Sequence, residues 1–265
     1  MRYTAEVHAL TGTFPFGQPS GRCLPRRISP AQALVLGVYP SALHIRWTHP
    51  QQRIAALAVA EEPWPFWAGE DEAELVDRWR QAVGWRPEWG TAAPVGRLNG
   101  SSGRVVRDRV LLPLGLDSDS VWMTDALPFF HAHRASGSQG EAMSTRYDPF
   151  ARSHGLPVHQ LPDRPSMDSL VRRAVTEEGP RLLDEIAESS APLVITLGNE
   201  ALAVAARLLD GYLPDRLTID DNYGERHPVE VRGRAVEVLP LVHPGQRGAD
   251  WTRTHEAWIG RQTGR

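Results

Sequence analysis

The sequence predicts an α/β fold, in which one central, mainly parallel sheet of four strands lies between two layers of helices. Four short apolar runs indicate the strands, because a parallel strand covered on both faces is hydrophobic along its whole length. These runs span residues 33–38, 120–124, 192–198 and 236–242. Helical patterns separate the runs, which favours a three-layer α/β/α sandwich.

The other segments complete a single expected domain over residues 1–265. Helices are expected over residues 104–114, 166–189, 200–209 and 250–259, with a break in the second at Gly179-Pro180. The first 30 residues, rich in Pro, Gly and Arg from residue 15 onward, are expected to form an extended arm. Segments 61–97 and 131–165 are expected as surface insertions. The first carries an amphipathic helix and a cluster of tryptophans that we expect mostly in or over the core, and the second lacks apolar periodicity.

The composition excludes several classes of protein. The 265 residues are 41% apolar and 23% charged, which suits a globular protein with a full core. The net charge of -3 provides no global basic field, so any nucleic-acid site must be a local patch. Cys23 is the single cysteine, which excludes an internal disulfide framework and a cysteine-rich metal or iron–sulfur centre. We expect a cytoplasmic monomer with no cofactor, no metal, no secretory signal and no membrane span.

Polar or turn residues follow the ends of the predicted strands. Tyr39, Asp125, Gly198 and His243 each stand at the carboxyl end of an apolar run. Ligands bind beyond these ends in open parallel sheets, so we expect the four residues at one edge. Of three His-Pro pairs, only His243-Pro244 follows a strand that reads as buried, which is how a sheet presents a polar group from a loop. Taken alone, such a histidine is more often bonded to the backbone than catalytic.

A Gly/Ser turn at residues 99–103 opens the helix of residues 104–114. Such a turn offers free backbone N–H groups to an anion, but a flexible connector has the same composition. Both interpretations stay open at this point.

Five ordered segments carry a resemblance to a known family. They are Leu36-Gly37-Val38-Tyr39-Pro40-Ser41, residues 100–103 with 115–116, residues 121–125, residues 194–198 with Ala201, and residues 242–245. In this order and spacing they resemble the motifs of the uracil-DNA glycosylase superfamily, across nearly the whole predicted core. The resemblance implies a monofunctional DNA glycosylase, which flips a nucleotide out of DNA and hydrolyses its N-glycosidic bond to leave an abasic site. DNA is the partner implied, either double-stranded with a flipped nucleotide or single-stranded.

The resemblance also implies roles for individual residues. His243 would donate a hydrogen bond to O2 of the departing pyrimidine, where negative charge develops, and such a donor is typically worth ~3 kcal/mol. Tyr39 would position the attacking water. The base-binding residues implied are Gly37, Val38, Ser41 and Asp125. The DNA-binding residues implied are Ser102, Gly198, Asn199, Pro244, Gln246 and Arg247, the last entering the minor groove.

Three departures from the best-known uracil enzymes affect the expected substrate. Tyr39 stands where those enzymes have an aspartate that orients water, and a phenol is a poor base near neutral pH. Ser41 replaces a tyrosine that excludes bases substituted at C5, so the pocket should be roomier there. Asp125 replaces a uracil-reading asparagine. As a carboxylate it would accept but not donate hydrogen bonds, which suits the N4 amino group of cytosine better than O4 of uracil.

Leu98 replaces the aromatic residue that stacks on the base in the iron–sulfur branch, so Trp64, Phe66 or Trp67 is expected to stack instead. The first hypothesis is therefore excision of a C5-modified cytosine, such as the hydroxymethyl or glucosylated cytosine of phage DNA, with anti-phage defence as the purpose. A conventional repair glycosylase for uracil or other deaminated bases is the alternative, and it requires Asp125 to be protonated or to face away. A catalytically silent DNA-binding homologue and a nucleoside hydrolase are two further possibilities.

Overall fold

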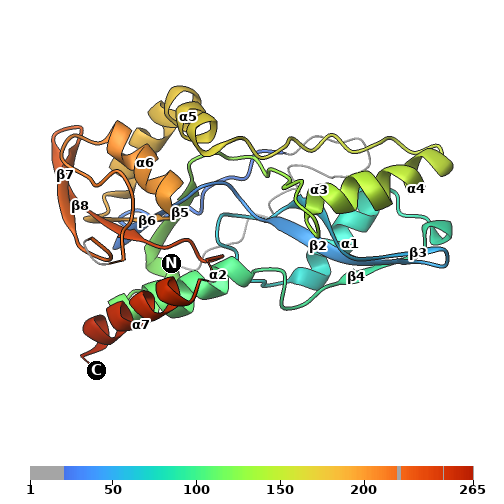
Figure 1. Cartoon of the computed structure of the whole chain (residues 1–265), viewed down its shortest axis with the longest axis horizontal. Helices are drawn as coiled ribbons and strands as arrows, with labels where there is room; N and C mark the ends of the chain where they lie inside the picture. Colours follow the sequence, from blue (N-terminus) through green and yellow to red (C-terminus); the bar gives the residue numbers. More distant parts are fainter. Residues whose placement is uncertain (1–20, 220–221, 247, 265) are drawn as a thin grey trace.

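A five-stranded, mostly parallel sheet forms the centre of the computed structural model, which describes residues 21–219, 222–246 and 248–264. Its order is β5 (Val121–Asp125), β1 (Ala33–Gly37), β6 (Leu193–Leu197), β8 (Arg234–Leu241) and β7 (His227–Val231). All neighbours are parallel except β7 and β8, which form an antiparallel hairpin. Helices flank the sheet, with α5 and α6 on one side and α2 and α7 on the other (Figure 1). The chain therefore has the predicted α/β class.

The expectation of four strands was one strand short. The additional strand, β7, begins with His227-Pro228, one of the two His-Pro pairs that follow no buried-looking strand in the sequence. Only Val229 and Val231 of this strand are buried, in alternation with exposed residues. Strand β7 has only one buried face and tolerates proline at the edge of the sheet, so it lacks the continuous apolar run of the strands that are buried on both faces.

The expected helices are present, with two corrections. The helix predicted over residues 104–114 begins earlier, as α2 (Ser101–Val106), and continues through turns at Arg107–Leu111 and Leu112–Leu114. The others are α5 (Met167–Ser189), α6 (Asn199–Leu208) and α7 (Ala249–Thr263). The predicted break at Gly179-Pro180 is absent, because α5 runs through both residues. A Cβ at Gly179 would lie 3.1 Å from Leu208 of α6, so burial of α5 against its neighbour outweighs the local cost of proline.

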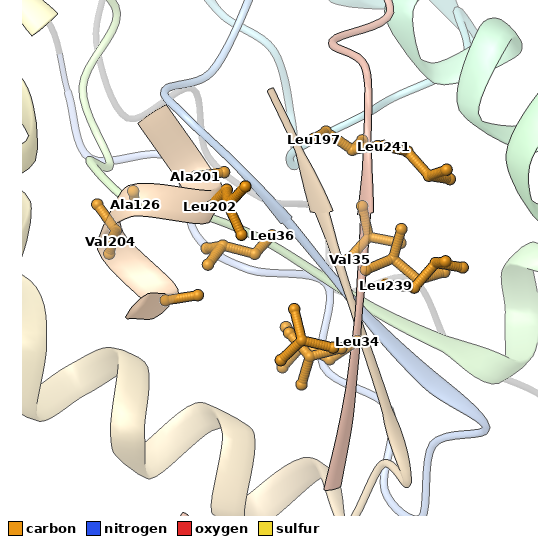
Figure 2. Packing of buried hydrophobic residues seen from close by; sticks show 14 of the residues in the cluster. Leu34, Val35, Leu36, Ala126, Leu197, Ala201, Leu202, Val204, Leu239 and Leu241 are labelled. Atoms are coloured by element: carbon orange, nitrogen blue, oxygen red, sulfur yellow. The ribbon is translucent and has the colours of Figure 1, made fainter. Parts of the chain in front are cut away.

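The strands β1, β5 and β6 are buried along their entire length. Their alternate side chains enter two helical layers: Leu36 packs toward Ala201 and Leu202 of α6, whereas Val35 and Leu239 lie together on the opposite side (Figure 2). Burial on both faces is what makes these strands uniformly apolar and so recognisable in the sequence. It also fixes their carboxyl ends rigidly at one edge of the sheet.

A second, antiparallel sheet was not anticipated. It has the order β3 (Gln52–Glu61), β2 (Ala42–His49) and β4 (Thr91–Pro94). Around it lie α1 (Glu72–Ala82), α3 (Gln139–Ala142), α4 (Asp148–Ser153) and short helical turns at Pro87–Trp89 and Met143–Tyr147. One further 3₁₀ turn, Ser118–Ser120, precedes β5.

The two predicted insertions meet in the core of this second sheet. Trp67, Trp79 and Trp89 are buried there, as expected for most of the tryptophans. Tyr147 and Phe150 are buried in the same cluster, so the surface location expected for residues 131–165 is wrong for the middle of that segment. Its aromatic residues are spaced along short, irregular helices, which show no periodicity over a long window.

The structure describes only part of the predicted N-terminal arm. Of the predicted arm, residues 1–20 lie outside the described residues, while Arg26 pairs with Met123 along the outer edge of β5. None of the helices within the described ranges is long and apolar enough to cross a bilayer.

Candidate active site

A cavity of about 650 Å³ opens at the carboxyl edge of the five-stranded sheet. Tyr39 follows β1, Asp125 ends β5 and His243 follows β8, and all three side chains line this cavity. The prediction that these strand ends gather at one edge is confirmed for them. The lining also includes four other residues implied by the resemblance, namely Val38, Ser41, Ser102 and Gln246.

The remaining expected site residues lie behind the residues that line the cavity, or outside the described residues. A Cβ at Gly37 would lie 2.1 Å from Oδ1 of Asp125, so this glycine makes room for the carboxyl group. Gly198, with φ of 93°, allows His243 to pack against the end of β6. Asn199 lies in the first turn of α6, and its Oδ1 accepts a hydrogen bond from the Leu217 backbone N–H at 2.8 Å. Pro244 is buried and outside the lining, and Arg247 lies outside the described residues.

The Gly/Ser turn at residues 99–103 has a packing role. Cβ atoms at Gly100 and Gly103 would each lie 2.2 Å from backbone atoms of residues 66–69. These glycines therefore let α2 approach the segment that carries Phe66. Close packing of the backbone therefore explains the glycines of this turn without a bound anion.

The tautomer of His243 is defined by its own turn. The backbone N–H of Gly245 donates to Nδ1 of His243 at 3.0 Å. In a neutral imidazole with Nδ1 as the acceptor, the proton resides on Nε2, which is then a donor. Desolvation by the cavity wall lowers the pKa of His243 below its ordinary value although the residue is partly exposed, with Glu200 opposing and Arg164 adding to the shift. At neutral pH the site therefore holds an uncharged hydrogen-bond donor at the end of β8.

Asp125 differs from the carboxylate expected from the sequence. Burial raises the pKa of Asp125 to about 8, while the Arg181 guanidinium opposes this shift and Glu185 adds to it. Arg181 also donates to the backbone oxygen of Asp125 at 2.9 Å and so fixes the end of β5. At neutral pH the carboxyl group is mostly protonated, and it can donate one hydrogen bond as well as accept others.

Glu62 is a second buried carboxyl group in the wall, and no sequence pattern singles it out. The backbone N–H of Ser41 donates to its Oε1 at 2.9 Å. Burial and the neighbouring Asp125 raise the pKa of Glu62 to about 8, against hydrogen bonds from the backbone of Ser41 and Phe66. Glu62 thus ties the turn after β1 to the segment that carries Phe66.

Phe66 is the aromatic residue of the three candidates that reaches the cavity. A Cβ at Gly37 would lie 2.5 Å from its ring, so Phe66 and the Asp125 carboxyl group stand side by side over this glycine. Its φ of 60° is unusual for a bulky residue, and such backbone strain often occurs at functional sites. Trp67 is buried in the second core, and Trp64 packs against that core. Leu98 is 45% exposed and does not line the cavity.

A polar network crosses the wall between the ends of β1 and β6. Nε of Arg164 donates to the Tyr39 hydroxyl at 3.1 Å, and Nη2 of Arg164 donates to Oε1 of Glu200 at 2.5 Å. Nε2 of His133 lies 3.1 Å from the same Tyr39 hydroxyl. Burial raises the pKa of Tyr39, so the phenol stays neutral near pH 7.

The sequence did not identify Arg164, Glu200 or His133. Glu200 could have been found, because it stands two residues beyond the end of a predicted strand, next to Gly198. Arg164 and His133 come from the segment interpreted as a surface excursion, which folds back onto the strand ends. Burial lowers the pKa of the two other histidines of the wall, His44 and His131, to about 4 each. Among the described wall residues, Arg164 and Glu200 form the one ion pair.

Comparison with known proteins adds no relative. No model of a known protein family matches the chain, and a search among curated proteins gives no match. Among the described residues, no cluster of His, Cys, Asp and Glu has the geometry to hold a metal ion.

Proposed function

We propose that the protein is a DNA glycosylase of the uracil-DNA glycosylase type, which removes a C5-modified cytosine and leaves an abasic site. One observation carries the proposal: the strand ends with Tyr39, Asp125 and His243 surround a single cavity, where His243 presents a neutral Nε2–H. Such an enzyme would act as a monomer on phage DNA in the cytoplasm. Its expected substrates are hydroxymethylated or glucosylated cytosines.

His243 suits the departure of the base. When the bond between C1′ and the base nitrogen breaks, its electron pair leaves with the base, and the charge concentrates on O2. A fixed Nε2–H donor stabilises this charge and has little to stabilise before the bond breaks, which is the condition for lowering a barrier. Because His243 is neutral, it supplies a hydrogen bond and keeps its proton.

Asp125 and Phe66 suit the binding of a flipped base. The protonated carboxyl group of Asp125 can donate to N3 of cytosine and accept from its N4 amino group. The Phe66 ring, beside this carboxyl group, can stack on the base, as aromatic residues do for unpaired bases. This pairing with cytosine replaces the acceptor-only role that the sequence predicts for Asp125.

The same carboxyl group also complements uracil, by donating to O4 and accepting from N3–H. A conventional uracil glycosylase is therefore the second candidate, and its condition of a protonated Asp125 is met by the raised pKa. The preference for a modified cytosine rests on the C5 side of the pocket. Ser41 is small there, and a cavity of about 650 Å³ holds roughly 20 waters at ~30 Å³ each, which exceeds what a bare pyrimidine fills.

The test is excision from matched oligonucleotides that differ in one base. Uracil, cytosine, methylcytosine, hydroxymethylcytosine and glucosylated hydroxymethylcytosine would be compared by alkaline cleavage of the abasic product. We expect release of the hydroxymethylated or glucosylated bases, and loss of this release in Ser41→Tyr with DNA binding retained. Robust release of uracil alone would establish the second candidate, and no release of any base would refute both.

A further inference from the structure

Three carboxyl groups line the cavity, and they occupy two different environments. Asp125 and Glu62 are buried next to Phe66, and burial raises the pKa of each to about 8. Glu200 is at the other end, beside His243 and in an ion pair with Arg164. The cavity thus has two neutral carboxyl groups where a base would bind and one charged carboxylate next to the histidine.

The position of Glu200 in the fold orients its carboxylate. It stands in the first turn of α6, where the N-terminal end of the helix stabilises negative charge. Its Oε1 is held by Arg164 at 2.5 Å. Its Oε2 lies 3.8 Å from the point where a Cβ of Gly198 would be, and Cβ of His243 lies 3.2 Å from that same point. One carboxylate oxygen is therefore fixed by Arg164, and the other lies on the side of His243.

Tyr39 is less suited than Glu200 to activate water. Its hydroxyl group already has Arg164 and His133 as partners, and burial raises its pKa above the ordinary value of a phenol. The two other carboxyl groups are mostly protonated near pH 7 and cannot act as bases. Among the described residues of the wall, this leaves Glu200 as the carboxylate available for the nucleophile.

We propose that Glu200 is a catalytic residue, whose Oε2 orients and deprotonates the water that attacks C1′. This inference rests on the proposed glycosylase function. The water oxygen forms a bond to C1′ as the bond to the base breaks, and the electron pair of that bond leaves with the base. The proton released by the water passes to Glu200 and then to solvent, and solvent protonates the departed base. The negative charge of Glu200 also faces the positive charge that develops on the sugar.

The experiment measures single-turnover excision by the full-length protein on the base that the wild type releases. Glu200→Ala is expected to lower kcat by ~100-fold or more, the usual range for loss of a general base. Sodium formate should restore part of this rate, because formate fits the space left by the carboxylate, whereas sodium chloride at equal ionic strength should not. Glu200→Gln should be as slow as Glu200→Ala but should resist rescue, since its amide fills that space.

Two further variants separate catalysis from structure. Arg164→Gln breaks the same ion pair but keeps the carboxylate, so it should slow excision less than Glu200→Ala does, and formate should not restore its rate. Glu256 of α7 forms an exposed ion pair with Arg109. Glu256→Gln removes this pair, is the matched control and should retain the wild-type rate. The inference is overturned if Glu200→Ala keeps the wild-type rate, or if it loses no more kcat than Arg164→Gln and formate restores nothing. A wild type without excision of any base would overturn the proposed function itself, and this inference with it.

Discussion

The two sheets of the molecule contribute to the cavity in different ways. The five-stranded sheet has inner strands buried on both faces, and it delivers Asp125, His243 and Glu200 from strand ends or the turn just beyond them. The three-stranded sheet alternates buried and exposed side chains along β2 after Ile45, and its surroundings supply a wall that includes Glu62 and Phe66. The five-stranded sheet therefore fixes the side chains suited to chemistry, and the elements around the three-stranded sheet shape the space beside them.

The largest expected effect concerns the stability of the second sheet. Trp47 is fully buried there, its ring centroid lies 4.6 Å from that of Phe150, and its Nε1 donates to Trp89 at 2.6 Å. Trp47→Ala should lower the free energy of unfolding by about 3–5 kcal/mol, the range for removal of a large buried aromatic residue. Urea denaturation measures this loss. Tyr212→Ala, at a residue that is 79% exposed, is the control, and equal losses in both variants would contradict the buried role of Trp47.

The next effect concerns His243 at the end of the five-stranded sheet, and it should change the rate of excision without changing the free energy of unfolding. His243→Ala removes the donor to the departing base, and kcat should fall by about 100- to 1000-fold while DNA affinity is kept. Gel assays of excision and fluorescence anisotropy of DNA binding measure the two quantities. His227→Ala changes another His-Pro pair outside the cavity and is the control. Unchanged turnover in His243→Ala would contradict the proposed role of His243, whereas DNA binding without any turnover in the wild type would favour a silent DNA-binding protein.

Phe66 tests whether the wall takes part in base binding. Phe66→Ala should weaken binding of DNA with a flipped base by about 1–3 kcal/mol, the value of stacking one base on an aromatic ring. Phe66→Leu retains an apolar side chain without the aromatic face, so it should show most of the same loss. Binding as tight as that of the wild type in both variants would show that the base lies elsewhere in the cavity.

The smallest effect at neutral pH is expected for Asp125→Asn. An amide keeps both a donor and an acceptor, so activity should change little at neutral pH. The wild type should lose base binding as the pH rises through about 8, because Asp125 then ionises and loses its donor, whereas the variant should stay level. Measurement of kcat/KM against pH distinguishes the two. If kcat/KM of Asp125→Asn declined with pH as much as that of the wild type, the titrating group would be Glu62 instead. In that case Glu62→Gln would abolish the decline.

The same substitution has a consequence for stability. The folded protein keeps a proton on Asp125 that the unfolded chain releases near its ordinary pKa of 3.8. The free energy of unfolding therefore falls as the pH rises from about 4 to about 8, and it stays at its lower value above that range. Asp125→Asn should remove the share of this fall that Asp125 causes. Urea denaturation at about pH 6 and about pH 9 measures the difference between the wild type and Asp125→Asn, and Glu62 contributes to the fall that remains in the variant.

Much of the first sheet could be predicted from the sequence, and little of the second. The runs before Tyr39, Asp125 and His243 are mostly apolar because the last residues of each strand are buried, so their ends could be located within a residue or two. Strand β7 was missed because it buries only Val229 and Val231, in alternation with more exposed residues. The short helices around Phe150 were missed because their burial depends on β2 and β3, which lie about a hundred positions earlier in the chain.

The sequence by itself determined the α/β class, the strand ends and the residues that stand on them, because burial of parallel strands imposes a pattern that one chain displays locally. Only the tertiary structure decided the state of these residues. The proton on Asp125 follows from burial, and the donor position on His243 follows from the Gly245 N–H. The pairing of Glu200 with Arg164 follows from a segment that returns to the strand ends. Such properties depend on the distances between residues remote in the sequence, and these distances exist only in the folded chain.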